Sequence, residues 1–450
     1  MSNFRPIDRD TAFLFPPSVD EWLPQRHLAR YVVEVVDGLD LAEMVKAYRG
    51  SGSASYHPAM LLALLIYGCA TKVFSSRAIE RATYDSVAFR FIAANEHPDH
   101  DTIATFRKRF LPQIEDLFVE VLKLARTMGM LKLGTVGLDG TKIHANASRH
   151  SALSYGHAKK LEKQLKREVK QLLQLAEQAD AADIPDGMSV PEELERRETR
   201  LAAIAEAKQK IEARVKEEQD AEYQQKLAAR AAQEKRTGKK PPGPPPAPPS
   251  GKVEEKEQIN LTDEDSRIMK VAGGGFDQCY NAQAAVATGS MLIVANGLTQ
   301  AANDKQQLKP LIDKIKDLPE QLGRVECVLA DNGYLSEANV EHCVAAQIEP
   351  LISMKRERHN ASWKKRFAED PKAPPDSANA MEQMAYRLKT KRGKELYALR
   401  KQTPEPVFGI IKSAMGFRQF LLRGFENVKG EWNLVTMSWN IRRMFALNGA

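Results

Sequence analysis

The chain has 450 residues, 43% of them hydrophobic and 28% charged, with a formal net charge of +7, which is typical of a protein with two or three globular domains. Its longest apolar run, 59–70, is too short for a membrane span of roughly 20 residues, and no secretory signal is visible. Four cysteines without CxxC spacing argue against a zinc site and a disulfide framework, so we expect a cytoplasmic protein with reduced thiols.

The N-terminal segment 20–130 is predicted to be helical, because its apolar residues recur at spacings of three and four. Asp101 and Thr102 are the predicted cap of one of these helices. The segments 75–92 and 99–110 resemble the pieces of a helix-turn-helix motif. An ordinary helical bundle with a charged exterior is the alternative. The cations available to bind DNA phosphates are Arg77, Arg81, Arg107, Lys108 and Arg109.

A strand pattern follows in 131–150, and it contains Asp139 directly before Gly140. An Asp-Gly pair is a common hairpin signal, so one interpretation is that Asp139 only begins a turn. The other is that the strand presents this acid for chemistry, which requires further acids elsewhere in the chain.

An insertion over 151–238 then interrupts the strand pattern. Two long helices, over about 159–178 and 191–235, are predicted to pair as an antiparallel hairpin, followed by an extended or disordered Pro-rich linker over 239–256. The nearly balanced charge suggests contact with protein, so the hairpin either reaches a second subunit or packs only on itself. The heptad-like apolar positions are Leu161, Leu165, Val169, Leu172, Leu194, Leu201, Ile204, Ile211 and Val215.

Strands and helices alternate in the remainder of the chain, which predicts a mixed α/β sheet. Two antiparallel strands are expected around a turn at 288–290. A helix over 305–316, a strand in 325–335, a helix over 336–346 and a strand in 349–354 follow. With 131–150, the segment 257–450 would therefore form one domain, and 1–130 a separate helical one.

Asp331 repeats the arrangement around Asp139, since an apolar strand precedes it and Gly333 follows. Active sites of such sheets favour strand ends. Carboxylates are the ligands that Mg²⁺ prefers, and two ions about 3.5–4 Å apart support phosphodiester chemistry. We therefore expect Asp139 and Asp331 to share a metal site.

The third acid is expected in the helix that begins near Pro404. Glu405 and Lys412 lie seven residues apart, which places them on one helical face, and Tyr397 and Arg400 precede them. Lys412 and Arg400 would hold phosphate while Glu405 binds metal.

The segment 355–401 holds fourteen Lys and Arg against six Asp and Glu, a surplus larger than that of the whole chain. It is either a solvated face or the electrostatic footprint of a DNA binder, with Lys364, Lys365 and Arg366 as candidates for backbone contact.

The sequence resembles the DDE transposases of bacterial insertion sequences, through "YHPAMLLALLIYG", "DGTKIHANAS", "YNAQAAV", "ADNGYLS" and "EPVFGIIK". The resemblance implies a ribonuclease-H-like fold and a catalytic, metal-binding triad of Asp139, Asp331 and Glu405 with Mg²⁺ or Mn²⁺, two ions in all. Tyr397, Arg400 and Lys412 match the family's Tyr, Arg, Glu, Lys signature, although four residues separate Arg400 from Glu405 where the commonest form has three.

The function implied is cleavage of double-stranded DNA at terminal inverted repeats and transfer of the 3′ hydroxyl into target DNA. A homodimer assembled on DNA and a nucleoid-associated protein are expected. The alternatives are a nuclease of the same fold that does not join strands, and a DNA-binding coiled-coil scaffold without catalysis.

Overall fold

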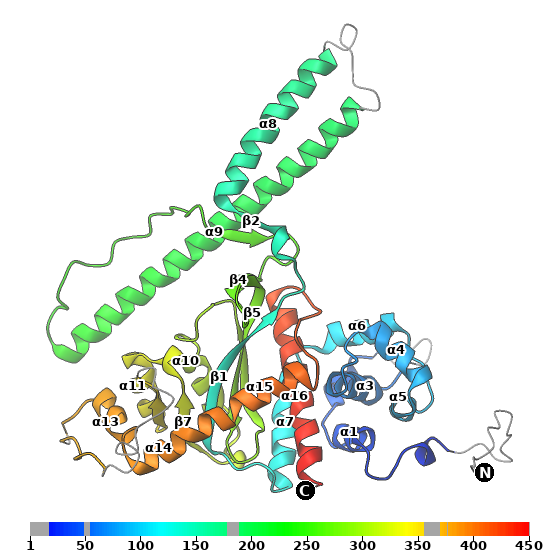
Figure 1. The fold of residues 1–450 in the computed structure, drawn as a ribbon, viewed down its shortest axis with the longest axis vertical. Coiled ribbons are helices and arrows are strands. Elements are labelled where there is room, and N and C mark those ends of the chain that lie inside the picture. The colour runs from blue at the N-terminus through cyan, green and yellow to red at the C-terminus, as the bar shows by residue number, and fades with distance from the viewer. Residues whose placement is uncertain (1–17, 49–54, 178–188, 355–369, 376, 450) are drawn as a thin grey trace, which may run out of the picture. The chain divides into compact units, whose positions relative to one another are not determined.

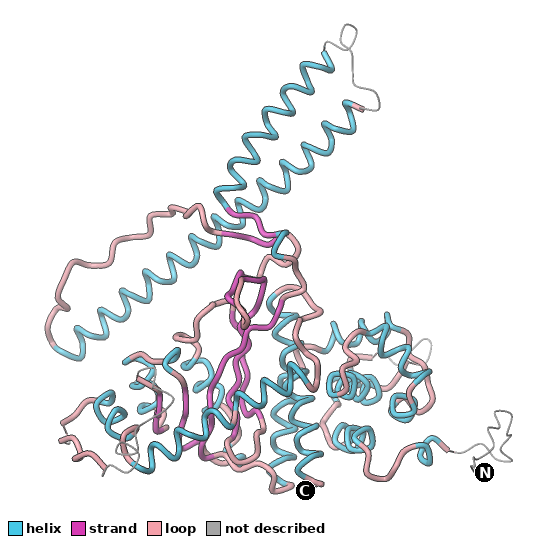
Figure 2. Tube along the Cα trace, viewed as in Figure 1, coloured by secondary structure: helices cyan, strands magenta, loops and turns pink. Residues whose placement is uncertain are grey.

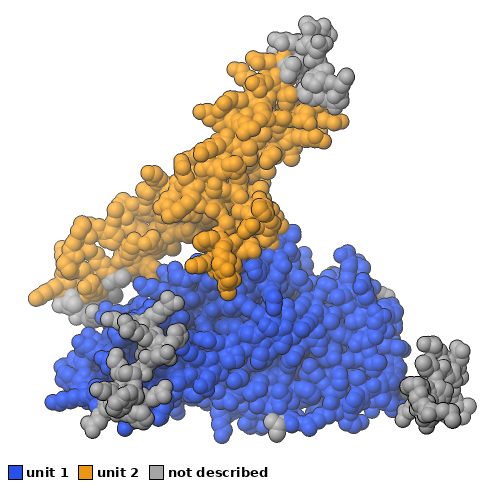
Figure 3. Space-filling view, in the orientation of Figure 1, with its two compact units in different colours: residues 1–146, 279–450 blue, residues 147–278 orange. Residues whose placement is uncertain are grey.

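The computed structural model describes residues 18–48, 55–177, 189–354, 370–375 and 377–449. The chain divides into two compact units, one of residues 1–146 with 279–450 and one of residues 147–278 (Figure 3). The helices predicted as an N-terminal domain share the first unit with the central sheet, and the second unit holds the insertion.

The N-terminal region is helical, as predicted (Figure 1). Four of its helices, α1, α3, α4 and α6, begin after a polar side chain that accepts a backbone N–H group, which satisfies a donor that lacks a partner within the helix. The cap predicted at Asp101 and Thr102 is wrong, because Asp99 accepts the Thr102 N–H at 2.7 Å and the helix begins at His100. The elements are η1 (Val19–Trp22), α1 (Leu28–Asp37), α2 (Ala42–Lys46), α3 (Pro58–Ala70), α4 (Ser76–Asp85), α5 (Val87–Ile92), α6 (His100–Phe110) and α7 (Ile114–Thr127).

The strands of the central sheet are magenta in Figure 2. The sheet is mixed, with the strand order β4-β5-β1-β7-β8, and β6 also pairs with β5. β5 is antiparallel to both β1 and β6, whereas β1, β7 and β8 are parallel. The predicted hairpin is confirmed, since the chain turns between β5 and β6 at 288–292. The strands are β1 (Gly134–His144), β4 (Arg267–Lys270), β5 (Phe276–Ala287), β6 (Ile293–Thr299), β7 (Val325–Ala330) and β8 (Glu349–Ile352).

Asp139 and Gly140 do not form a turn. β1 continues through both to His144 and stays paired with β5 along the way. The pairing of β1 with its other neighbour, β7, ends near Asp139, because it extends only as far as Gly137 and Leu329. Asp139 therefore lies where the sheet opens on the β7 side of a strand that itself continues.

The helices after β6 surround the sheet, and α10, α11 and α15 contact β6, β8 and β1 respectively. Short 3₁₀ turns lie between several of them. The elements are α10 (Leu308–Lys316), η3 (Glu320–Leu322), η4 (Asn332–Tyr334), α11 (Glu337–Ala345), α13 (Ala380–Arg387), α14 (Lys391–Ala398), η5 (Leu399–Gln402), α15 (Pro404–Ser413) and α16 (Phe425–Leu447).

The C-terminal helix α16 joins the N-terminal helices to the sheet. It contacts α1, α3 and α7 as well as β6. Its buried polar residues bond to β6: Asn440 Oδ1 accepts the Ile293 N–H and its Nδ2 donates to the Ile293 carbonyl, both at 2.8 Å, and Asn296 Nδ2 donates to Thr436 Oγ1 at 2.9 Å. α16 therefore forms the shared core of the first unit.

The second unit is built on a helical hairpin, as predicted. α8 (Tyr155–Glu177) and α9 (Val190–Thr237) pack on each other, and β2 (Ala152–Ser154) pairs with β3 (Gln258–Asn260) where the insertion leaves and rejoins the chain, next to η2 (Arg149–Ser151). Apolar residues of the hairpin fill one core: Leu153, Tyr155, Ala158, Leu165, Ile204, Ala207, Ile211, Val215 and Ile259. Four of the predicted heptad positions, Leu165, Ile204, Ile211 and Val215, therefore pack within the hairpin, while contact with a second subunit stays a prediction.

The Pro-rich linker has no regular secondary structure and is bonded to α9. Arg230 donates to the carbonyls of Pro241 and Pro244 at 2.9 Å, and Gln219 Nε2 donates to the Lys252 carbonyl at 3.1 Å. Of the helices that the structure describes, none is both long and apolar enough to cross a membrane.

Candidate active site

Asp139 is more buried than Glu405, with 20% of its side chain exposed against 51%. Burial raises the pKa of its carboxyl to about 6, because the charged form loses hydration. The Arg400 guanidinium and the Gly140 N–H, which donates to Oδ1 at 2.9 Å, lower this pKa, whereas the charges of Asp331 and Glu405 raise it. Asp139 therefore lies within the electrostatic reach of both other acids.

Arg400 lies between Asp139 and Glu405. Its Nη1 is 3.6 Å from Asp139 Oδ2 and its Nη2 is 3.2 Å from Glu405 Oε1, and only 10% of its side chain is exposed. The extra residue before Glu405 is accommodated by η5 and by Thr403, whose φ of −119° and ψ of −76° separate η5 from α15. The spacing differs from the commonest form of the signature, yet Arg400 still reaches both acids.

Asp331 directly follows β7. Its Oδ1 accepts the Gly333 N–H at 2.8 Å, which caps η4 and fixes the carboxylate at the strand end. Tyr397 donates its hydroxyl to the Ala330 carbonyl at 3.3 Å, so this member of the signature holds the residue before Asp331.

Glu405 lies in the first turn of α15, with Pro404 at the first helical position, where proline is favoured. Its side chain is half exposed. Lys412 lies on the same helix and donates to Thr141 Oγ1 at 2.6 Å and to the Lys142 carbonyl at 2.8 Å, so it ties α15 to β1. Burial lowers the pKa of Lys412.

The donor set of the three acids has the chemistry that a hard divalent cation requires, since all of its donors are carboxylate oxygens. The buried charge of Asp139 would be stabilised by a cation, as its raised pKa indicates. Among the described residues no three Asp, Glu, His or Cys side chains converge closely enough to ligate one ion, and Arg400 lies between two of the acids instead. The three carboxylates are therefore suitable ligands for a divalent cation. In this structure the positive charge next to two of them is the Arg400 guanidinium.

A hollow of about 760 Å³ adjoins Tyr397. Tyr397, Leu388 and Met354 supply apolar surface, and the lysines from the basic segment 355–401 are Lys389, Lys394 and Lys401. Cations around an apolar hollow, next to the tyrosine that bonds to Ala330, suit a nucleic-acid strand.

The other predicted DNA contacts differ in their surroundings. Arg77 on α4 and Lys108 on α6 are exposed, whereas Arg107 is half-buried and donates to the Phe74 carbonyl at 3.2 Å. Arg107 thus also supports the fold of the helical region. Lys364, Lys365 and Arg366 lie outside the described residues, and their contact with DNA stays a prediction.

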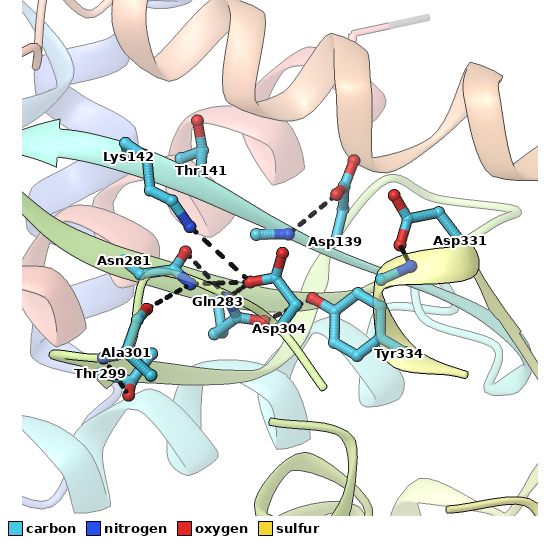
Figure 4. Close-up of polar contacts among 12 residues, drawn as sticks. Asp139, Thr141, Lys142, Asn281, Gln283, Thr299, Ala301, Asp304, Asp331 and Tyr334 are labelled. Atoms are coloured by element: carbon cyan, nitrogen blue, oxygen red, sulfur yellow. Dashed lines mark hydrogen bonds and ion pairs between the residues drawn. The ribbon is translucent and has the colours of Figure 1, made fainter. Parts of the chain in front are cut away.

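A polar cluster that sequence reasoning missed surrounds Asp304 (Figure 4). Asp304 Oδ1 accepts Asn281 Nδ2 and Gln283 Nε2, both at 2.7 Å, and Lys142 Nζ lies 3.9 Å from it. Tyr334, whose hydroxyl donates to Gln283 Oε1, completes this Asp304 cluster. A signal was present in "YNAQAAV", because amides two residues apart in an otherwise apolar strand need a polar partner when they are buried.

The Asp304 cluster supports the backbone on which two of the acids lie. A Cβ atom on Gly140 would come within 2.2 Å of Gln283 Nε2 and 2.7 Å of Asp304 Oδ1, so only glycine fits next to Asp139. A Cβ atom on Gly333 would lie 3.7 Å from Asp304 Oδ2. Glycine is therefore required at position 140 because the side chains of Gln283 and Asp304 lie close to its backbone, and not because the chain turns there.

Replacing Asp304 with Asn is expected to slow the DNA cleavage that the resemblance implies about 10–100-fold, the effect typical of a residue that orients the groups next to a metal. The amide keeps one acceptor but loses the charge that attracts Lys142. The matched control is Asp313→Asn, an acid whose partner is His342 on α11, which should leave the rate unchanged. Equal rates for Asp304→Asn and the unmodified chain would contradict a positioning role.

Two family models match the chain. The Transposase domain (DUF772) matches residues 17–109, and the Transposase DDE domain matches residues 251–441, together well over half of the sequence. The DDE domain implies a ribonuclease-H-like fold, which agrees with the mixed sheet described above. No curated protein and no solved structure matches.

Proposed function

From the premise that the chain belongs to the DDE transposases of insertion sequences, we propose that it cleaves transposon ends and transfers the resulting 3′ hydroxyl into target DNA. The observation that carries this proposal is the meeting of Asp139 from β1 and Glu405 from α15 at the Arg400 guanidinium, beside Asp331 at the end of β7. These residues lie far apart in the sequence, and the fold brings their charges to one place.

In the proposed reaction Asp139, Asp331 and Glu405 are catalytic and would hold Mg²⁺ or Mn²⁺, two ions in all. Such ions, when bound, activate the attacking oxygen and stabilise the leaving one. Cleavage breaks the bond between phosphorus and the bridging 3′ oxygen of the transposon end, and water supplies the new oxygen on phosphorus. In strand transfer the freed 3′ hydroxyl attacks a target phosphodiester, and a target 3′ oxygen leaves.

The remaining residues would bind and orient DNA. Arg400 would exchange its acids for a phosphate once cations neutralise them, because a guanidinium forms bidentate bonds with phosphate. Lys412 ties α15 to β1 and Tyr397 bonds to the end of β7, and both would border the bound DNA strand. The wider DNA surface would include Arg77, Lys108 and the basic segment 355–401, and two chains would assemble as a homodimer on paired ends.

A strand-transfer assay with Mg²⁺ tests the proposal. Purified chain, a duplex carrying a terminal inverted repeat of the element, and a supercoiled target plasmid are expected to yield joined products. Cleaved ends without joined products would favour the nuclease, and binding without cleavage would favour the inactive scaffold. A chain with Asp139, Asp331 and Glu405 each replaced by the corresponding amide is the control and should give neither product.

A further inference from the structure

The balanced charge of the insertion conceals a basic face on α8. Between residues 159 and 170 the sequence has six Lys or Arg and only two acids, Glu162 and Glu168. The six cations, all exposed, are called the α8 basic face: Lys159, Lys160, Lys163, Lys166, Arg167 and Lys170.

The α8 basic face lies opposite the side of α8 that packs on α9. Ala158, Leu165 and Leu172 are buried and lie on one side of the helix, because they are seven residues apart. At 100° per residue, the six cations fall on the other side. Four of them, at spacings of four, three and four, form a continuous row: Lys159, Lys163, Lys166 and Lys170.

The two acids of this segment pair with only one cation of the row, Lys166. Glu162 Oε1 accepts Lys166 Nζ and its Oε2 accepts Lys208 Nζ of α9, both at 2.6 Å, while Glu168 accepts Arg197 Nε of α9 at 2.7 Å. Within the described part of the chain, Lys163, Arg167 and Lys170 have no acid within ion-pair distance.

The two helices of the hairpin differ in their charge patterns. On α9 several cations pair with acids one turn away, as in Arg196–Glu193, Lys210–Glu206 and Lys226–Glu222. On α8 residues four apart carry like charges, as in Lys159 and Lys163, and such pairs destabilise a helix. A solvated helix gains nothing from this pattern, whereas a polyanion would offset the repulsion.

We propose that the α8 basic face binds the phosphate backbone of duplex DNA, so that the insertion is a second DNA-binding element outside the cleavage centre. The row from Lys159 to Lys170 is about 16 Å long, a distance over which duplex DNA presents a charge about every 1.7 Å of its axis. The six-residue hollow over this face, of about 450 Å³, is lined by five of the cations and Glu162. The inference rests only on DNA as the partner and not on the cleavage chemistry.

The test compares two triple variants of the full chain that remove the same charge from the same unit. The test variant is Lys163→Gln/Arg167→Gln/Lys170→Gln, and the matched control is Arg196→Gln/Lys210→Gln/Lys226→Gln, whose cations already have acid partners. Binding to a random-sequence duplex of about 40 base pairs is measured without divalent ions over a range of salt concentrations. The slope of log K against log salt is expected to become shallower by about 2–3 for the test variant, because each lost phosphate contact contributes about 0.9, and to stay unchanged for the control.

Equal slopes for the test variant and the unmodified chain would overturn the proposal, as would equal losses in both triple variants, since the latter would reflect net charge alone. Lys163→Arg/Lys170→Arg keeps the charge and is expected to bind as the unmodified chain does. A changed sedimentation coefficient of the test variant with an unchanged slope would identify a protein partner and refute DNA. A chain whose binding depends on the α8 basic face but which does not cleave would refute the proposed function while supporting this inference.

Discussion

Asp139→Asn is expected to lower DNA cleavage by about 10³-fold or more while DNA binding stays within about twofold. The amide has nearly the shape of the carboxylate and can still accept the Gly140 N–H, but it lacks the charge that would hold a divalent cation beside Asp331 and Glu405. Cleavage of an end duplex with Mg²⁺ and a gel shift without it measure the two effects separately. Normal cleavage by this variant would remove Asp139 from the triad.

The same substitution is expected to stabilise the metal-free protein above pH 6. The pKa of Asp139 is raised from 3.8 to about 6 in the folded chain, so ionisation favours unfolding, and stability contributed by this group falls as the pH rises through this window. Asn cannot ionise, so the variant avoids this destabilisation, which amounts to at most about 3 kcal/mol above pH 6. Urea unfolding in EDTA at pH 4 and pH 8 measures the free energy of unfolding of the variant and of the unmodified chain. Asp220→Asn, on the exposed surface of α9, is the control. A variant that is less stable at pH 8 would show that the Arg400 contact outweighs the burial of the charge.

Trp432→Ala is expected to destabilise the chain by about 3–5 kcal/mol, the usual cost of removing a fully buried aromatic side chain. Trp432 on α16 stacks on Phe408 of α15 with ring centroids 6.3 Å apart, and its Nε1 donates to the Gln283 carbonyl at 3.2 Å. It therefore connects the helix that bears Glu405 with the strand that bears Gln283. The cleavage rate is expected to fall even at temperatures where the variant stays folded, because α15, which bears Glu405, loses its contact with α16.

Trp432→Phe separates the two contributions of this side chain. It keeps most of the apolar contact and loses the hydrogen bond, for which about 1 kcal/mol is expected. Denaturant unfolding of both variants measures these differences. A loss below about 1 kcal/mol for Trp432→Ala would mean that α15, α16 and β5 do not depend on one shared core.

The sequence predicted the elements whose signals are local. The hairpin helices agree with their heptad positions to within a few residues, and the helix predicted over 336–346 is α11. The strand predicted in 325–335 is shorter, because β7 ends at Ala330 and 332–334 form the 3₁₀ turn η4. Asp139 was harder to interpret, because Asp-Gly favours a turn locally and only the pairing of β1 with β5, more than 130 residues later, keeps the strand extended.

The role of α16 was not visible in the sequence. Its apolar residues have no one-sided pattern, because the helix is buried on several sides and its polar residues, such as Asn440 and Thr436, bond to the sheet. The Asp304 cluster was not predicted from the sequence for a related reason. The partners Lys142, Asn281, Gln283 and Asp304 come from three separate segments, and their contacts depend on the register of β1 against β5.

The pairing of β2 with β3 makes the insertion a separable module in evolution. Ala152–Ser154 and Gln258–Asn260 lie side by side, so the hundred or so residues between them begin and end at neighbouring points. The entropy of closing such a loop grows only slowly with its length, so lengthening or shortening the hairpin changes the stability of the remaining fold little. Mobile elements could therefore exchange or remodel this module, and with it the proposed DNA contact of α8, without altering the three acids proposed to carry out cleavage.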